Sequence, residues 1–148
     1  MPAAQVTALD WAAVLEVALE VAQGAGVAAR YRTLPGSAFE VDWGAGYDLV
    51  LLTNFLHHFD RDTCVELLKR ARRGLAAGGQ ALALDFVPNE DRVLPPFPAM
   101  FAFMMLGSTP KGDVYTAREY SELGRSAGFT EVTARALPPS PQSLIRFQ

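Results

Sequence analysis

Short apolar runs alternate along the chain with longer stretches in which apolar residues recur at helical spacing. The short runs are typical of strands, and the run YDLVLLTNFL is continuous enough for a strand buried on both faces. Two further strands are expected around the turn sequence PPSP near the end of the chain. The predicted strands cover residues 5–10, 30–36, 47–56, 80–87, 129–137 and 142–147.

Helices are predicted between these strands, over 11–26, 60–79 and 115–129. The second is expected to stop at the glycine pair that closes 60–79, because glycine commonly ends a helix. The third opens with Thr116-x-x-Glu119, the spacing of a capping box. This strand and helix order predicts an α/β fold with a mostly parallel sheet and helices on both faces, formed as one domain over 1–148.

Polar residues stand where four of the predicted strands end. Asp10, the turn 36–39, the segment 53–58 and Asp85 all occupy such positions. Because the carboxyl ends of parallel strands share one edge of a sheet, where α/β proteins bind ligands, we expect these residues to line a site. His57 is one of only two histidines in the chain.

Composition excludes several other functions. The 148 residues carry a net charge of −3 with no extended basic run, which disfavours a nucleic-acid partner. The single cysteine, Cys64, rules out an internal disulfide and a cysteine-based metal site. The N-terminus lacks a secretory pattern, and no run approaches the roughly 18 apolar residues of a membrane helix. We therefore expect a cytoplasmic protein with no membrane partner.

Several segments in order carry a resemblance to a known family: VTALDWAAVLEVA, PGSAF, YDLVLLTNFLHHFD, LAAGGQALALDFVPNEDR, YTAREYSELGRSAGF and PPSPQSLI. From Gln5 to the C-terminus the chain resembles the catalytic domain of class I S-adenosylmethionine-dependent O-methyltransferases. Bacterial small-molecule enzymes with an N-terminal dimerisation domain are the most similar in pattern. The resemblance implies a Rossmann-like, three-layer αβα fold and methyl transfer to a hydroxyl group.

The resemblance assigns cofactor-binding positions at the strand ends. An acid in the place of Asp10 accepts hydrogen bonds from the cofactor's ribose hydroxyls, which suits a carboxylate because it offers only acceptors. Asp10 could equally cap the helix that starts at Trp11, and the two roles are compatible. Ser37 stands where the family carries an acid toward the adenine, so a plain serine turn is the alternative there. The resemblance adds Trp11, Ala38 and Thr53 to the cofactor-binding set.

His57 matches the general base of the family. Methyl transfer from a sulfonium is an in-line displacement, and the acceptor hydroxyl must lose its proton as the new bond forms. Asp85 matches an acid that orients this base, and a structural histidine at a strand end is the alternative. His58 is interpreted as pocket lining or helix entry. Asn54 could face the acceptor or bond nearby loop backbone.

The stretch 87–113 stands where the family binds its acceptor. Its phenylalanines and methionines, among them Phe101 and Met105, would form an adaptable apolar wall for a flat aromatic or polyketide-like substrate. A buried core helix is the alternative for at least half of these residues. No metal ligands are predicted.

One part of the family pattern is missing ahead of residue 5. The family's first strand and glycine-rich cofactor loop would precede QVTALDW, and the sequence has no GxGxG. The chain is thus expected to be a partial catalytic domain, truncated at its N-terminus, that leaves the strands 5–10 and 47–56 with unpaired edges. Those edges predict a homo-oligomer such as a homodimer, with segment exchange between the copies as one way to pair them. Two functions compete: an O-methyltransferase completed by further chain, and a non-catalytic remnant that acts as an interaction module.

Overall fold

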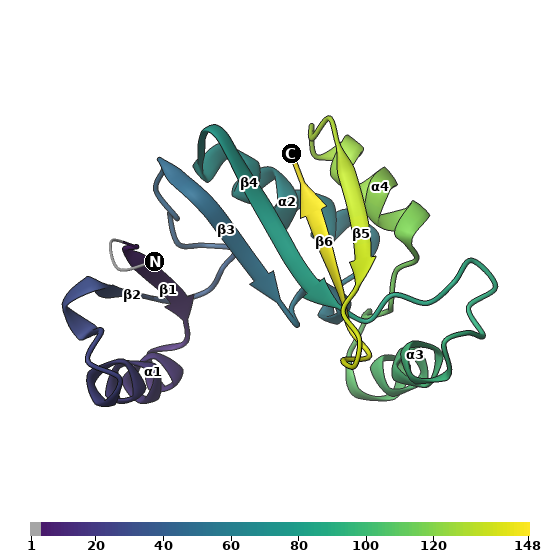
Figure 1. Ribbon diagram of the computed structural model, residues 1–148, viewed down its shortest axis with the longest axis horizontal. Coiled ribbons are helices and arrows are strands. Elements are labelled where there is room, and N and C mark those ends of the chain that lie inside the picture. Colours follow the sequence, from purple (N-terminus) through teal and green to yellow (C-terminus); the bar gives the residue numbers. More distant parts are fainter. Residues whose placement is uncertain (1–3) are drawn as a thin grey trace. The chain divides into compact units, whose positions relative to one another are not determined.

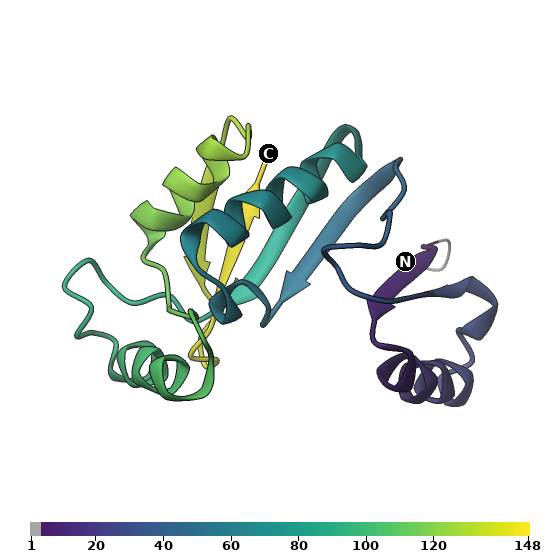
Figure 2. The same ribbon diagram turned by 180° about the vertical axis from the view of Figure 1, so that it is seen from behind.

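The computed structural model describes residues 4–148, and the chain forms two compact units with a boundary after Gly44 (Figures 1 and 2). The single domain predicted over 1–148 stays a prediction, and the two units are described separately. Each unit has its own sheet, and the order of strands is β1-β2 in the first and β3-β4-β6-β5 in the second. The α/β class predicted from the sequence is confirmed.

The first unit is a parallel strand pair joined by a helix. Its elements are β1 (Val6–Asp10), α1 (Ala12–Gly24), η1 (Ala28–Arg30) and β2 (Tyr31–Pro35). The strands pair in parallel from Val6 opposite Tyr31 to Asp10 opposite Pro35. A helical crossover is the connection that parallel neighbours require.

Only part of the apolar face predicted for 11–26 is buried. Leu15 and Ala22 are the buried residues of α1, whereas Trp11 and Val14 are 63% and 48% exposed. The physical reason is the width of this unit, because two strands offer apolar surface for only one narrow stripe of a helix.

The second unit is built on a four-stranded sheet. Its elements are β3 (Tyr47–Thr53), η2 (Leu56–His58), α2 (Arg61–Gly74), β4 (Leu75–Asp85), α3 (Pro96–Ser108), α4 (Ala117–Ser126), β5 (Val132–Ala136) and β6 (Ser143–Phe147). Helices α2 and α4 lie side by side over one face of the sheet (Figure 2). Their buried faces, with residues such as Leu67, Leu68 and Leu123, form the core together with Ile145 and Phe147 from β6.

This sheet is mixed, and a single strand, β6, departs from the mostly parallel arrangement that the sequence predicted. Strands β3 and β4 are parallel, but β6 is antiparallel to both β4 and β5. The connection from β5 to β6 is a tight turn around Pro138–Pro141, and so short a link can join only antiparallel neighbours. The PPSP sequence predicted the turn correctly, but the sequence analysis did not predict that this turn makes β6 antiparallel to β5.

The second predicted helix ends earlier than expected. Helix α2 stops at Gly74, and the glycine pair Gly78-Gly79 lies inside β4. The pairing of β4 with β3 is irregular there, and a Cβ on Gly79 would lie 2.8 Å from the carbonyl oxygen of Tyr47. The glycines therefore allow a bulge and a close backbone approach rather than ending a helix.

The capping box predicted for α4 is present. The Thr116 hydroxyl accepts from the Glu119 amide, and the Glu119 carboxylate accepts from the Thr116 amide. Helix α2 is capped in a similar way by Asp60, whose side chain accepts from the amide of Thr63 at 3.0 Å. That bond and the nearby Lys111 ammonium hold the pKa of Asp60 well below its usual value.

The predicted unpaired edges are also observed. Among residues 4–148, β1 pairs only with β2 and β3 pairs only with β4. Within that same range, no helix has the length and apolar character needed to cross a bilayer.

Candidate active site

The carboxyl ends of β3 and β4 lie next to each other. Thr53 is opposite Leu84, and the amide of Asn54 donates to the carbonyl of Leu84 at 2.8 Å. Asn54 then adopts a left-handed conformation, with φ of 51°, and turns the chain into η2. This turn brings His57 over the end of β4, where Asp85 is the last residue.

His57 and Asp85 form a buried hydrogen-bonded pair. His57 Nδ1 lies 2.7 Å from Asp85 Oδ1, and the two residues are 3% and 0% exposed. The same oxygen accepts from the amide of Phe86 at 2.8 Å, and Oδ2 accepts from the Tyr120 hydroxyl at 3.1 Å. A carboxylate has only acceptors, so Nδ1 carries the proton in the neutral ring and Nε2 keeps its lone pair. This is the arrangement of a histidine oriented to accept a proton.

Aromatic rings surround this histidine. The Phe101 ring meets His57 edge-on with the centroids 4.8 Å apart, and it packs on Phe86 at 4.3 Å. Phe101 comes from α3, which lies beyond the carboxyl end of β4 (Figure 1). Met105 on the same helix is buried, whereas Phe103 is 77% exposed. Most of the phenylalanines and methionines of α3 are therefore exposed, so the alternative that at least half of them are core is wrong, and the acceptor-binding role of 87–113 stays a prediction.

His58 and Asn54 have separate surroundings. His58 is exposed, and its ring centroid is 4.4 Å from that of His57. Partial burial, followed by the neighbouring His57, lowers the pKa of His58 below its ordinary value. The side-chain oxygen of Asn54 accepts from the amide group of Gln142, which ties the end of β3 to the turn between β5 and β6. This partner is not the nearby loop backbone that the sequence suggested.

In the first unit, Asp10 lies at the end of β1. Its Oδ1 accepts from the amide of Trp11 at 2.7 Å, and its carbonyl accepts from the amide of Gly36 at 2.9 Å. Trp11 is itself the N-cap residue of α1 and makes no side-chain capping bond. Asp10 therefore precedes the cap, and it sits beside the turn that follows β2, as expected of adjacent parallel strand ends.

That turn is held by its own side chains. Ser37 Oγ accepts from the amide of Phe39 at 3.2 Å, and the carbonyl of Ala38 accepts from the indole of Trp43 at 3.0 Å. Gly36 has φ of 137°, and a Cβ there would lie 2.5 Å from Val41. Ser37 therefore stabilises this turn, which is the alternative that the sequence gave for it. In the other unit, Thr53 is exposed at the end of β3.

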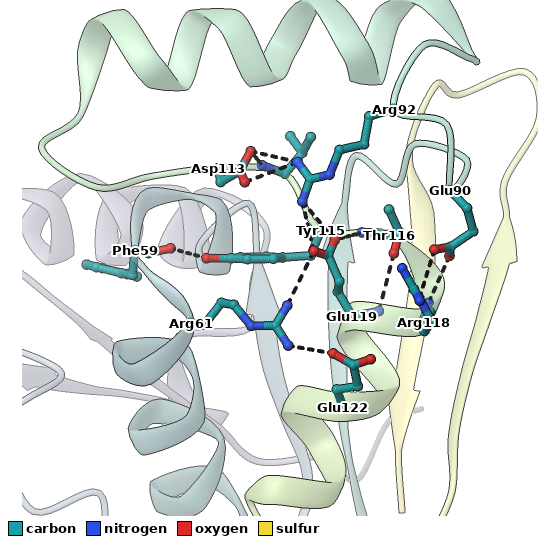
Figure 3. Close-up of polar contacts among 11 residues, drawn as sticks. Phe59, Arg61, Glu90, Arg92, Asp113, Tyr115, Thr116, Arg118, Glu119 and Glu122 are labelled. Atoms are coloured by element: carbon teal, nitrogen blue, oxygen red, sulfur yellow. Dashed lines mark hydrogen bonds and ion pairs between the residues drawn. The ribbon is translucent and has the colours of Figure 1, made fainter.

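A network of ion pairs fastens the segment 86–116 to helix α4, and helix α4 to helix α2 (Figure 3). The Arg92 guanidinium donates to both oxygens of Glu119 at 2.9 Å and to those of Asp113 at 3.1 and 3.2 Å. Arg61 reaches Glu119 at 3.3 Å and Glu122 at 2.7 Å. Burial alone would raise the pKa of Glu119, but the Thr116 amide and Arg92 lower it. The sequence analysis missed this network because its members are far apart in the chain.

Replacing Arg92 by Ala is expected to loosen residues 87–95 without unfolding the protein. Exposed ion pairs contribute at most about 1 kcal/mol to global stability, but Arg92 joins both ends of the segment that carries α3. Hydrogen exchange followed by mass spectrometry should show faster exchange in 87–95. The control is Arg146→Ala, which breaks the pair with Glu131 on the sheet. Unchanged protection of 87–95 would contradict the anchoring role.

Comparison with known proteins agrees with this geometry. The α/β fold matches that of solved O-methyltransferase structures. The family model of the O-methyltransferase domain matches residues 1–130, and the chain belongs to this family. The family resemblance drawn from the sequence is confirmed.

Individual relatives show the extent of the similarity. The chain is 30% identical over 140 residues to 3-hydroxy-5-methyl-1-naphthoate 3-O-methyltransferase of Streptomyces sahachiroi, which covers 94% of this chain and 40% of that protein. It is 38% identical over 88 residues to chicken acetylserotonin O-methyltransferase, covering 60% of this chain and 25% of that protein. The chain spans less than half the length of these relatives.

Solved structures extend the comparison. A candidate O-methyltransferase of Nostoc punctiforme has a TM-score of 0.96 and 50% identity over 99% of this chain and 45% of its own. An O-methyltransferase family 2 protein of Planctomyces limnophilus, solved with apigenin, has a TM-score of 0.88 and 29% identity over 97% of this chain and 43% of its own. Another neighbour, PigF, was solved with SAH at 27% identity.

Proposed function

We propose that this chain carries the acceptor-activating part of an S-adenosylmethionine-dependent O-methyltransferase that acts on a small-molecule hydroxyl group. The observation that carries the proposal is the buried His57–Asp85 pair, 2.7 Å apart at the carboxyl edge of β3 and β4. The His57 ring packs against Phe101 of α3, and this contact supports a flat acceptor bound next to the histidine.

The residues divide the chemistry between them. S-adenosylmethionine, when bound, supplies a methyl group on a positively charged sulfur. His57 Nε2 accepts the proton of the acceptor hydroxyl, and a general base contributes about 10²–10⁴-fold to the rate of such a reaction. Asp85 holds Nδ1–H, which fixes the tautomer and leaves Nε2 as the acceptor of that proton.

In the first unit, we propose that Asp10 binds the ribose of this cofactor. Asp10 is exposed, and Oδ1 accepts from Trp11. A carboxylate at a strand end suits a vicinal diol, because two hydroxyl donors meet a group that only accepts. Trp11, Ser37, Ala38 and Thr53 are the further cofactor contacts that we propose.

The acceptor that we propose is a flat aromatic compound bearing a hydroxyl group. Phe97 packs on Phe86 at 5.1 Å, and Phe86 in turn packs on Phe101, so three rings form one aromatic surface near His57. The named relatives methylate a naphthoate and acetylserotonin, which are themselves flat and aromatic. Asn54, His58 and Met105 complete the substrate-binding set that we propose.

A homo-oligomer and a cytoplasmic location are also part of the proposal. The single partners of β1 and β3 among the described residues support self-association. Sedimentation of the purified chain as a monomer at micromolar concentration would contradict it. The alternative of a non-catalytic interaction module gains no support from the comparisons, whose relatives carry methyltransferase names.

Calorimetric titration with S-adenosylmethionine tests the proposed function, with S-adenosylhomocysteine as a second ligand. Saturable binding of both is expected, and Asp10→Ala should weaken it about tenfold to a hundredfold, because hydrogen bonds to a charged group contribute about 1.5–3 kcal/mol. The matched control is Glu20→Ala, which removes an exposed carboxylate from α1.

No binding at millimolar ligand would reject cofactor binding by this chain. Equal affinity of the native chain and Asp10→Ala would instead reject only the role of Asp10.

A further inference from the structure

Asp85 has a third partner that the sequence analysis did not identify. The Tyr120 hydroxyl, from the first turn of α4, donates to Asp85 Oδ2 at 3.1 Å. Tyr120 is 0% exposed, and its ring packs edge-on against Tyr115 at 5.8 Å and Phe147 at 6.3 Å. An aromatic residue at helical spacing is read as core from sequence alone, so nothing distinguished this hydroxyl.

We propose that Tyr120 is a positioning residue for His57, acting through the carboxylate of Asp85. The two carboxylate oxygens have different partners. Oδ1 binds His57 Nδ1 and the amide of Phe86, which is the next residue in the chain and moves with Asp85. Oδ2 binds Tyr120, which belongs to a different element. The terminal torsion of an aspartate is broad, so a donor from outside the strand is needed to hold the carboxylate plane.

The surroundings keep this donor in place. The capping box of Thr116 and Glu119 fixes the first turn of α4, which includes Tyr120. Burial, together with the neighbouring Asp85, raises the pKa of the Tyr120 phenol well above its ordinary value. The phenol therefore keeps its proton and donates to the carboxylate, which leaves the carboxylate as the acceptor for His57.

The catalytic meaning of this contact rests on the proposed function, but the contact can be tested without methyl transfer. The ¹⁵N chemical shifts of a histidine ring report which nitrogen carries the proton. We expect His57 in the native chain to be the Nδ1–H tautomer. In Tyr120→Phe the ¹⁵N chemical shifts of the His57 ring should move toward the average of the two tautomers, because the Asp85 carboxylate has lost the donor that holds its plane.

The chain offers a matched control in Tyr115→Phe. Tyr115 is 2% exposed, and its hydroxyl donates to the carbonyl of Phe59 rather than to Asp85 (Figure 3). Tyr115→Phe removes the same atom from an equally buried ring, and it should leave the His57 signals unchanged. His58→Gln in each background assigns the signals, since the chain has two histidines.

The outcomes separate the two proposals. Unchanged His57 shifts in folded Tyr120→Phe, or equal changes in both variants, would overturn the positioning role. A chain that shows the expected shifts but transfers no methyl group would reject the proposed function alone. If Tyr120→Phe does not fold, incorporation of 3-fluorotyrosine into Tyr115→Phe replaces it. That stronger donor should move the Nδ1-bound proton of His57 upfield, and no movement would overturn the proposal.

Discussion

Replacing His57 by Ala is expected to lower the rate of methyl transfer to a phenolic acceptor by about 10²–10⁴-fold. In the function that we propose the imidazole is the base that takes the hydroxyl proton, and the described residues place no other ring nitrogen against Asp85. Cofactor affinity should be unchanged, because His57 is not among the cofactor residues that we propose. The measurement is transfer of an isotope-labelled methyl group, in a preparation shown by calorimetry to bind S-adenosylmethionine.

His58→Ala is the matched control for this variant. His58 belongs to the substrate-binding set that we propose, but it makes no hydrogen bond to a carboxylate among its described contacts, so its loss should raise the acceptor KM and change kcat far less. Equal rates for His57→Ala and the native chain would reject the role of His57 as base. Equal losses in the two histidine variants would point to a disturbance of η2 rather than to lost proton transfer.

Replacing Asp85 by Ala is expected to lower the free energy of unfolding by at least about 3 kcal/mol. Three donors converge on this carboxylate, and a buried donor left without an acceptor costs about 1–3 kcal/mol. Urea denaturation measures the change. Asp113→Ala, which removes a carboxylate bound to Arg92 at the surface, should cost no more than about 1 kcal/mol.

Asp85→Asn refines this comparison. The amide keeps one oxygen acceptor but directs N–H donors at either His57 or Tyr120, so its stability should lie between those of the native chain and Asp85→Ala. A loss below about 1 kcal/mol for Asp85→Ala would mean that the three hydrogen bonds are not made in solution.

Local patterns predicted the elements well, because their causes are local. Apolar runs placed the strands, and the Thr116 and Glu119 spacing placed the start of α4. The glycine pair Gly78-Gly79 was interpreted as a helix end because local chemistry cannot distinguish that role from a bulge. The bulge depends on close approach of the Tyr47 carbonyl, which is a long-range contact.

The sequence predicted some residues of the candidate site and missed others, because only some of its contacts follow from local patterns. His57 follows β3 and Asp85 ends the neighbouring parallel strand β4, so the strand ends predicted one shared site, and the family resemblance predicted the pair itself. Tyr120 and Arg92 reach the site region from parts of the chain whose placement depends on the packing of α4. The antiparallel direction of β6, which the sequence analysis did not foresee, completes the sheet on which α4 packs.

The anchoring of the segment 86–116 has a consequence for how this fold can diversify. Arg92 and Asp113 fasten its two ends, and Glu119 and Tyr120 are neighbours on the helix that receives Arg92 and orients Asp85. The residues between the anchors carry the open apolar surface of α3. If these side chains bind the acceptor as we propose, substitutions between the anchors can change substrate preference while Asp85 and Tyr120 keep their contacts, so acceptor choice and proton transfer can evolve independently.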